Sequence, residues 1–345
     1  MNIFEEYFKL LRMPDKYGIN MSSIPKLYHY TSVKALKSIL SSQDLFLTYL
    51  RDFDDESEGR IVGELLESYN PNAPRVSDLK YFVFSMCEHQ DDFQHWMVYG
   101  DKQTGVSIEF SFDQSSISQR NCAICKIVYD SNIQKEIIHY LLERGEKIKK
   151  DVNNFLKLEN TLSSSTLLGV TLASYLTKTP SIMALSSPLV MNVGVGGLIA
   201  TFLYDVYQKH KKAETGHVIE ILKKIIQADD IDSFIDSTPQ YLSKAIIPFF
   251  KSQRYASEEE IRLVYAMTDK NNVIPIYRRS NRQGEDCSYV SLRDILNISP
   301  EDRTYRLPIS NITIGPDCTL SNYRAIQKLV NDLNLPIKVT TCHLY

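Results

Sequence analysis

Three groups of polar residues in this 345-residue chain could act on a small ligand. The first centres on His29, in the run KLYHYTS (26–32), whose β-rich composition predicts a strand leading into a helix. A histidine beside a helix N-terminus can hydrogen-bond the hydroxyls of a sugar, while the helix amides favour a phosphate. A satisfied structural histidine is the alternative.

The second group lies in SEEEIRLVYAM (257–267), which we predict to be a strand. With a period of two residues, Glu258, Glu260 and Arg262 share one face of that strand. Two carboxylates beside a guanidinium form either a surface ion-pair ladder, which contributes little stability, or a cleft in which one carboxylate stabilises positive charge on a substrate.

The third group contains Ser85, Trp96 and Tyr99, followed by a turn between Gly100 and Gly105. Trp96 is the only tryptophan of the chain. Beside a tyrosine and a glycine-bounded turn, it can form the wall of a pocket for a planar ring. A purely structural aromatic cluster is the alternative.

The acidic loop and the cysteines favour no metal site. Residues 51–60 carry Asp52, Asp54, Asp55, Glu56 and Glu58 without suitably spaced histidines, so a solvated loop is favoured over the site of a metal hydrolase. Cys122 and Cys125 have no second ligand pair, which indicates free thiols. The acidic N-terminal run lacks the features of a signal peptide, so we expect a cytoplasmic protein.

Length and composition bound the classes of protein that the chain can represent. At 345 residues the chain is longer than the roughly 250–300 residues at which a single hydrophobic core stops growing, so we expect one large or two small compact units. Its 43% hydrophobic and 23% charged residues are typical of a folded protein. With 39 basic against 42 acidic residues, the chain has no overall positive charge that would indicate nucleic-acid binding. The net charge does not exclude a local basic groove.

The hydrophobic pattern predicts an α+β architecture that positions these three groups. A strand, a helix and a strand are expected in succession over 26–50, followed by strands at 81–87, at 106–110 and around Cys122 and Cys125. Residues 289–296 read as a strand entering a turn, and the C-terminal tail as strand, helix, strand. We divide the chain into an N-terminal helix (1–24), an α+β core (25–130 and 245–345) and a helical insert (131–244).

The insert contains an apolar hairpin over 162–204 whose only charged residue is Lys178. Pro180 separates a shorter piece from a longer one, Ile182–Tyr204, which reaches the roughly 20 residues needed to span a bilayer. The interpretations left open are a buried helical pair, the contact face of a homo-oligomer, and a hairpin that inserts into a membrane. The last would make the protein membrane-associated.

A set of short motifs resembles the bacterial family known as domain of unknown function 2971. The resemblance covers about 25–112 and 245–340. The chain departs from the family pattern at Asp54 and Glu56, where Asn and Pro are usual, at Ile261, where an aromatic residue is usual, and in the apolar insert at 160–204, which the pattern lacks. The matching motifs, in order, are Tyr28-His29-Tyr30-Thr31-Ser32, Phe84-Ser85, Trp96-Met97-Val98-Tyr99-Gly100-Asp101, Glu258-Glu259-Glu260-Ile261-Arg262 and Ile314-Gly315-Pro316.

More distantly, the order of strands bearing a histidine and a glutamate is similar to the ADP-ribosyltransferase superfamily, especially its DNA-modifying toxins. This resemblance implies a strand-rich core that takes NAD as its substrate. His29 would hydrogen-bond the nicotinamide-side ribose, Tyr30 or Tyr99 would stack on the nicotinamide, and Glu260 or Glu258 would bind the ribose 2′-hydroxyl. The further NAD-binding positions that it implies are Thr31, Ser85, Trp96 and Arg262.

The function implied is an ADP-ribosyltransferase-like enzyme, acting as a toxin or in defence against phage. It would transfer ADP-ribose from NAD to a nucleic acid or a protein, or simply hydrolyse NAD. The alternative is a non-enzymatic effector that acts on membranes, or a nucleotide-sensing module, with the apolar 162–204 segment as its active part. Loss of activity on Glu260→Gln would favour the enzyme, and loss on introducing charges into Leu198–Leu203 would favour the effector.

Overall fold

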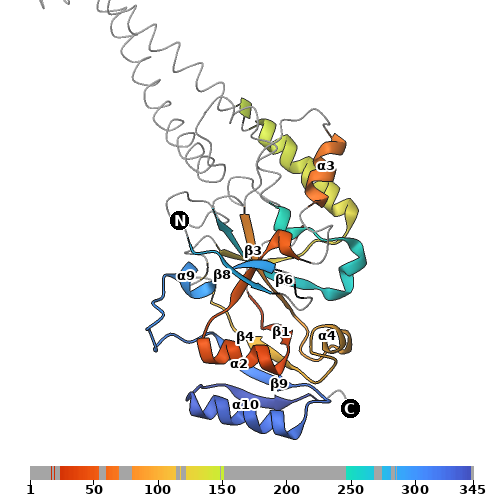
Figure 1. The fold of residues 1–345 in the computed structure, drawn as a ribbon. Coiled ribbons are helices and arrows are strands. Elements are labelled where there is room, and N and C mark those ends of the chain that lie inside the picture. The colour runs from red at the N-terminus through yellow and green to blue at the C-terminus, as the bar shows by residue number, and fades with distance from the viewer. Residues whose placement is uncertain are drawn as a thin grey trace, which may run out of the picture. The chain divides into compact units, whose positions relative to one another are not determined.

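The computed structural model describes residues 17, 19, 24–53, 60–69, 80–113, 117, 122–147, 149–150, 246–267, 274–280, 284 and 286–342. The chain divides into two compact units, of which the first comprises Met1–Leu142 with Gln240–Tyr345 and the second Glu143–Pro239. Nearly all the described residues belong to the first unit, whose elements are labelled in Figure 1.

A ten-stranded, mostly antiparallel sheet organises the first unit, so the predicted α+β class is confirmed. Its main path runs β10-β9-β4-β1-β3-β2-β8-β7, and β6 pairs with both β3 and β5. The strands are β1 (Leu27–Thr31), β2 (Phe46–Tyr49), β3 (Lys80–Cys87), β4 (Val106–Phe110), β5 (Cys122–Lys126), β6 (Glu260–Met267), β7 (Tyr277–Ser280), β8 (Asp286–Ser291), β9 (Ile309–Ile314) and β10 (Lys338–Thr341).

The helices around this sheet are mostly short. The α-helices are α2 (Val33–Ser42), α3 (Ile61–Tyr69), α4 (Phe93–Val98), α9 (Leu292–Leu296) and α10 (Leu320–Asp332), and residues 131–147 are also helical. The 3-10 helices are η2 (Leu50–Asp52), η4 (Ile247–Phe249) and η5 (Gln253–Glu258). Within the part of the chain that is described, no helix is long and apolar enough to cross a membrane.

Local sequence signals account for the order of the first elements. The predicted strand–helix–strand start is confirmed as β1, α2 and β2. Ser32 caps α2, because its hydroxyl accepts a hydrogen bond from the amide of Ala35. Gln43 ends the helix in the left-handed conformation, with φ 50°. The predicted strand, helix and strand of the tail are likewise confirmed as β9, α10 and β10.

One predicted strand boundary is wrong. The strand expected from residue 257 begins only at Glu260, because Glu258 ends η5 and Glu259 turns the chain with φ 41°. Residues 289–296, predicted as a strand entering a turn, are the end of β8 followed by the short helix α9. The Ser291 hydroxyl caps this helix by accepting from the amide of Asp294.

One side of the sheet carries the main hydrophobic core. Helices α2, α9 and α10 contribute Leu36, Leu40, Leu292, Ile295, Ile326 and Val330 to this core. From β6, the alternate residues Ile261, Leu263 and Tyr265 enter the same core, which leaves Glu260 and Arg262 on the opposite side of the strand. Figure 1 shows α2 and α10 at the end of the sheet where β4 and β9 lie, and these two helices contact one another.

Strand β3 lies at the centre of the fold and is shared unequally by its neighbours. Along one edge, β6 pairs with it over its whole length, from Lys80 to Cys87. Along the other edge, β2 pairs with Phe82 and Val83, whereas β1 pairs only with Cys87. Between these two contacts β1 and β2 separate, and the carbonyl of Ser85 faces this gap in the pairing.

Several predicted features lie outside the described residues. They are the N-terminal helix apart from Tyr17, Ile19 and Ile24, the apolar hairpin 162–204, and the acidic positions 54–58. The interpretations of the hairpin as core, oligomer contact or membrane insertion therefore stay predictions.

Candidate functional site

A buried cluster of four charged side chains forms where β6 begins. Glu260 and Arg262, two residues apart on one face of the strand, are 4% and 0% exposed. The guanidinium binds the carboxylate through both oxygens, with Nε 2.7 Å from Oε1 and Nη2 3.0 Å from Oε2. It also donates to the carbonyl of Pro248, at 3.0 Å. Glu260 and Arg262 therefore form an ion pair on one face of the strand, but this pair is buried rather than on the surface.

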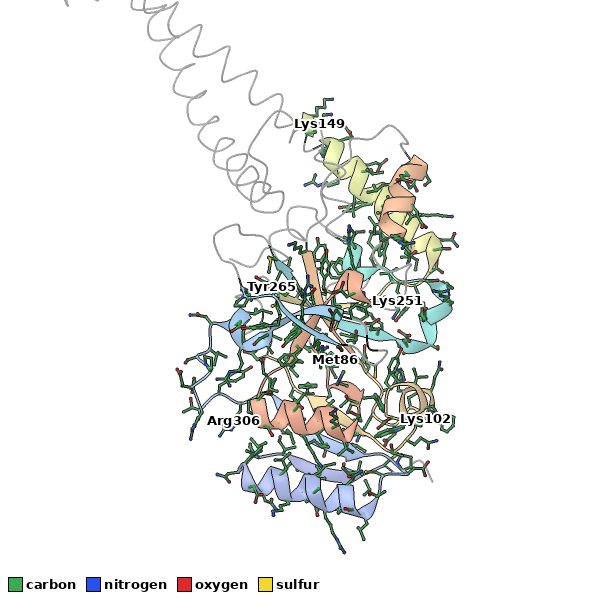
Figure 2. All side chains as sticks on the ribbon, in the orientation of Figure 1. Met86, Lys102, Lys149, Lys251, Tyr265 and Arg306 are labelled. Atoms are coloured by element: carbon green, nitrogen blue, oxygen red, sulfur yellow. The ribbon has the colours of Figure 1, made fainter. Side chains whose placement is uncertain are left out.

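Lys251 completes the cluster and was missed by the sequence prediction. It lies between η4 and η5, where Figure 2 labels it, and its side chain is only 9% exposed. Its ammonium lies 2.5 Å from Oε2 of Glu258 and 3.0 Å from Oε2 of Glu260. Two cations thus face two anions, which leaves the cluster with no net charge. Buried Gln134 braces this segment by donating to the carbonyl of Lys251.

Glu260 is held in its ionised form by its neighbours. Burial alone would raise the pKa of this carboxyl, because desolvation disfavours the charged state. The adjacent Arg262 and Lys251 cations outweigh burial, assisted by the hydroxyl of Ser85, so that the pKa lies well below its usual value. Each carboxylate oxygen accepts two hydrogen bonds: Oε1 from the Ser85 hydroxyl and Nε of Arg262, and Oε2 from Lys251 and Nη2 of Arg262. All four lone-pair positions of Glu260 are therefore occupied.

Ser85 connects the two predicted site residues His29 and Glu260. Its hydroxyl donates to Glu260, and its main-chain carbonyl, in the gap between β1 and β2, lies 2.9 Å from Nδ1 of His29. The His29 ring packs on Phe84, with centroids 4.4 Å apart. Since Phe84 and Ser85 point to opposite faces of β3, the histidine and the carboxylate approach Ser85 from its two sides. That both line one cleft stays a prediction.

Glu258 occupies a different environment from Glu260. The left-handed turn at Glu259 separates the two, so Glu258 lies on a 3-10 helix rather than on the strand. Its side chain is 14% exposed, with Oε1 accepting from the Tyr99 hydroxyl at 2.6 Å and Oε2 from Lys251. Burial and this hydrogen bond to a carboxylate raise the pKa of Tyr99, which keeps the phenol protonated as a donor. The structure therefore brings Glu258, Glu260, Arg262 and Tyr99 together.

Helix α4 places Trp96 and Tyr30 in a small core of their own. Trp96 is fully buried, and its ring meets that of Tyr30 edge to face, with centroids 4.9 Å apart. The Tyr30 hydroxyl donates to the carbonyl of His89 and accepts from the amide of Asp92. Both rings are thus part of the packing behind α4, and the stacking of Tyr30 or Tyr99 on a nicotinamide stays a prediction.

The turn after α4 packs tightly against β1, and this explains why residue 105 is a glycine. A Cβ atom on Gly105 would lie 2.2 Å from the carbonyl oxygen of Thr31, a buried residue at the end of β1. Three consecutive residues in the turn, 101–103, have positive φ values of 53°, 52° and 71°. Thr31 therefore serves to dock the turn that follows Tyr99.

Neither the cysteines nor the acidic residues form a metal site in what the structure describes. Within these residues no three histidine, cysteine or acidic side chains gather closely enough to hold a metal ion. Cys122 and Cys125 lie on β5 as predicted, buried and unbonded to each other. Asp52 accepts a hydrogen bond from the amide of Ser288, at 2.6 Å.

His95 and Lys251 are the residues of this site that sequence reasoning missed. His95 precedes the tryptophan of the W-x-x-Y-G-D motif, and its ring contacts the carbonyl of Glu258. The signal available for it was its position three residues after Asp92, the capping residue of α4. Lys251 carried no comparable signal, because a single lysine in an irregular segment is normally solvated.

Comparison with known proteins gives one finding. The model of the family described as "Protein of unknown function (DUF2971)" matches residues 95–263. The predicted resemblance to this family is therefore confirmed where it overlaps the match, at 95–112 and 245–263, whereas the matched range also includes the insert, which we placed outside the family pattern. The match includes His95, Lys251, Glu258, Glu260 and Arg262, whereas His29 and Ser85 lie before it. No curated protein and no solved structure matches the chain significantly.

Proposed function

We propose that the chain carries an NAD-cleaving site of the ADP-ribosyltransferase type, with Glu258 as its reacting carboxylate. The observation that supports this proposal is the pair of glutamates at the start of β6. One is saturated with hydrogen bonds and buried, and the other is partly open and fixed by a phenol and an ammonium. Such a pair supplies a preorganised anion for a reaction that develops positive charge.

Glu258 rather than Glu260 is assigned as the reacting carboxylate because of the lone pairs that each has left to accept a hydrogen bond from a ligand. A carboxylate that binds a ribose hydroxyl must accept a further hydrogen bond. Glu260 already accepts four, whereas Glu258 accepts two, one on each oxygen. Glu258 therefore fits the role of ribose ligand, and Glu260 fits that of a support which holds Lys251 in place.

In the proposed reaction the bond between C1′ of the ribose and the nicotinamide nitrogen breaks. The electron pair leaves with nicotinamide, and the ribosyl cation is stabilised by the carboxylate of Glu258. Water or a nucleophile on an acceptor then forms the new bond to C1′ and releases its proton. Tyr99, the more exposed of the two stacking candidates, would stack on the nicotinamide. The resemblance also assigns the ribose to His29, but His29 approaches Ser85 from the side opposite Glu260, so the proposed reaction does not depend on it.

Nicotinamide release from NAD by the purified full-length chain tests the proposal. We expect Glu258→Gln to lower the rate about 100-fold or more, because it removes the negative charge while keeping the shape of the side chain. Glu259→Gln is the matched control: this neighbour is exposed, pairs with His89, and should keep the wild-type rate. A wild-type rate no greater than that of Glu258→Gln would refute the proposed activity.

In cells, such an activity fits a toxin or a phage-defence protein that acts in the cytoplasm. Expression of the wild-type chain in bacteria should then slow growth and lower cellular NAD or modify a macromolecule, whereas Glu258→Gln should be harmless. Mass spectrometry of nucleic acid and protein from the same cultures would identify the acceptor. Harmless expression with unmodified NAD, nucleic acid and protein would count against this role.

A nucleotide-binding module without catalysis is a second candidate, favoured by the complete satisfaction of Glu260. Calorimetry separates the two. A module should bind NAD with an affinity that Glu258→Gln leaves nearly unchanged and should release no nicotinamide. The enzyme should consume NAD during the titration.

A further inference from the structure

Helix α4 holds the segment that carries Glu258 through three successive contacts. Gln94 Nε2 lies 2.9 Å from the hydroxyl of Ser257, His95 Nε2 lies 3.0 Å from the carbonyl oxygen of Glu258, and the Tyr99 hydroxyl donates to Oε1 of Glu258. One helix thus fixes both the main chain and the side chain of the same glutamate. Of these contacts, the one from His95 depends on which protons the ring carries, because an imidazole nitrogen can either donate or accept.

Both nitrogens of the His95 ring face acceptors. Nδ1 lies 2.7 Å from Oδ1 of Asp92, and Nε2 faces the Glu258 carbonyl, which has no proton to donate. Asp92 is itself ionised: burial would raise its pKa, but hydrogen bonds from the side chain and amide of His95 prevail and lower it. The ring can therefore make both hydrogen bonds only when both nitrogens carry protons.

We propose that His95 is a positioning residue for Glu258 and that it acts as the imidazolium. The inference rests on the proposed function, because it concerns the carboxylate assigned there. Protonated His95 ties the carbonyl of Glu258 to the capping residue of α4, and the left-handed turn at Glu259 follows directly. With a neutral ring, one of the two nitrogens would present a lone pair to an acceptor, and one anchor of this segment would be lost.

The surroundings of the ring fit this role. Its side chain is only 5% exposed, so solvent cannot readily replace either partner. The charged and titratable groups that face it are Asp92 and Tyr99, the residues that cap its own helix, Tyr30 on β1, and His89 on the segment after β3. His89 is paired with the exposed Glu259, with Nε2 2.6 Å from Oε2. Among these groups Asp92 is the one in direct contact with a ring nitrogen.

The first test is independent of activity. Nitrogen-15 NMR of histidine-labelled full-length protein reports whether each ring nitrogen carries a proton, and the missing signal in His95→Gln assigns His95. We expect both nitrogens of His95 to be protonated at about pH 7. A single protonated nitrogen at that pH would overturn the proposal.

The second test is the pH profile of nicotinamide release, measured between about pH 5 and pH 9. The wild-type kcat should fall as His95 loses its proton, while KM should change less. In His95→Phe the rate should be about tenfold or more lower, and the fall with pH should disappear. His95→Gln, which keeps one donor, should fall between the two, and the control His89→Gln should keep the wild-type profile. An unchanged pH profile in His95→Phe would contradict the positioning role.

Failure of this inference and failure of the proposed function give different results. If both nitrogens of His95 are protonated but neither the wild type nor any variant releases nicotinamide, the proposed NAD activity is refuted. The anchor, meaning the hydrogen bond from His95 to the Glu258 carbonyl, is then still supported. Hydrogen exchange then tests the anchor alone: the amides of residues 258–260 should exchange faster in His95→Phe than in the wild type. Equal exchange would refute the anchor as well.

Discussion

Replacing Arg262 by methionine tests how strongly the buried cluster holds the sheet. The guanidinium is fully buried and makes at least three hydrogen bonds, two to Glu260 and one to the carbonyl of Pro248. Its loss leaves the two carboxylates with Lys251 as the only cation of the cluster, so one buried negative charge is uncompensated. Breaking a buried ion pair in this way costs about 3–5 kcal/mol of unfolding free energy.

The matched control is the double variant Glu260→Met with Arg262→Met, which removes both charges and fills a similar volume. Lys251 and Glu258 then still form a neutral pair, at 2.5 Å. Replacement of a complete buried pair by apolar residues is often neutral or stabilising, so the double variant should recover most of the loss. The single variant Glu260→Met should be as unstable as Arg262→Met, because it leaves an excess positive charge.

Urea unfolding followed by tryptophan fluorescence measures these differences. Trp96 is the only tryptophan of the chain, and it is fully buried in the unit that contains the cluster. A loss of about 4 kcal/mol lowers the midpoint by more than about 1 M at the usual urea dependence. A cost below about 1 kcal/mol for Arg262→Met, or a double variant less stable than either single one, would refute this electrostatic account.

Three further predictions follow from described contacts. Because the pKa of Glu260 is lowered in the folded state, its contribution to stability is present above the ordinary value of 4.5 and is lost as the pH falls below it; urea midpoints should show this fall in the wild type and a weaker one in the Glu260→Met, Arg262→Met double variant. Gly105→Ala should cost about 1–3 kcal/mol because its Cβ would meet the Thr31 carbonyl, whereas Gly63→Ala, in open space on α3, should be neutral or stabilising by up to about 1 kcal/mol in the same assay. Burial raises the pKa of the Cys122 and Cys125 thiols, so alkylation followed by mass spectrometry should label Cys318 in the folded protein well before either of them, and equal rates would contradict their burial.

The sequence was informative wherever local patterns decide the structure. Alternation of apolar residues predicted β4, and the β-rich run 26–32 predicted a strand that leads into a helix, now seen as β1 and α2. The same alternation failed at Glu258 and Glu259, because a left-handed residue cannot be recognised from a series of glutamates. The pattern identified the residue types but not the turn that separates them.

The site itself was predictable only in part. Glu258, Glu260 and Arg262 were recognisable by their spacing, and they do lie in one cluster. Lys251 could not be found in this way, because its role depends on where an irregular segment crosses the end of β6. The contact of His95 with Glu258 joins residues 163 positions apart, and no local pattern contains that information.

The pairing of β5 with β6 has a consequence for the architecture of the whole chain. Cys122 lies opposite Tyr265, so two strands that are neighbours in the sheet are separated in sequence by the whole second unit. In the topology of the sheet, the second unit is an insertion into the loop that connects the antiparallel strands β5 and β6. The connection spans 133 residues (127–259), and closing a loop of this length rather than one of about 12 residues costs only about 2 kcal/mol more in chain entropy. The sheet can therefore accept segments of very different length and character at this one connection while the residues around Glu260 keep their places.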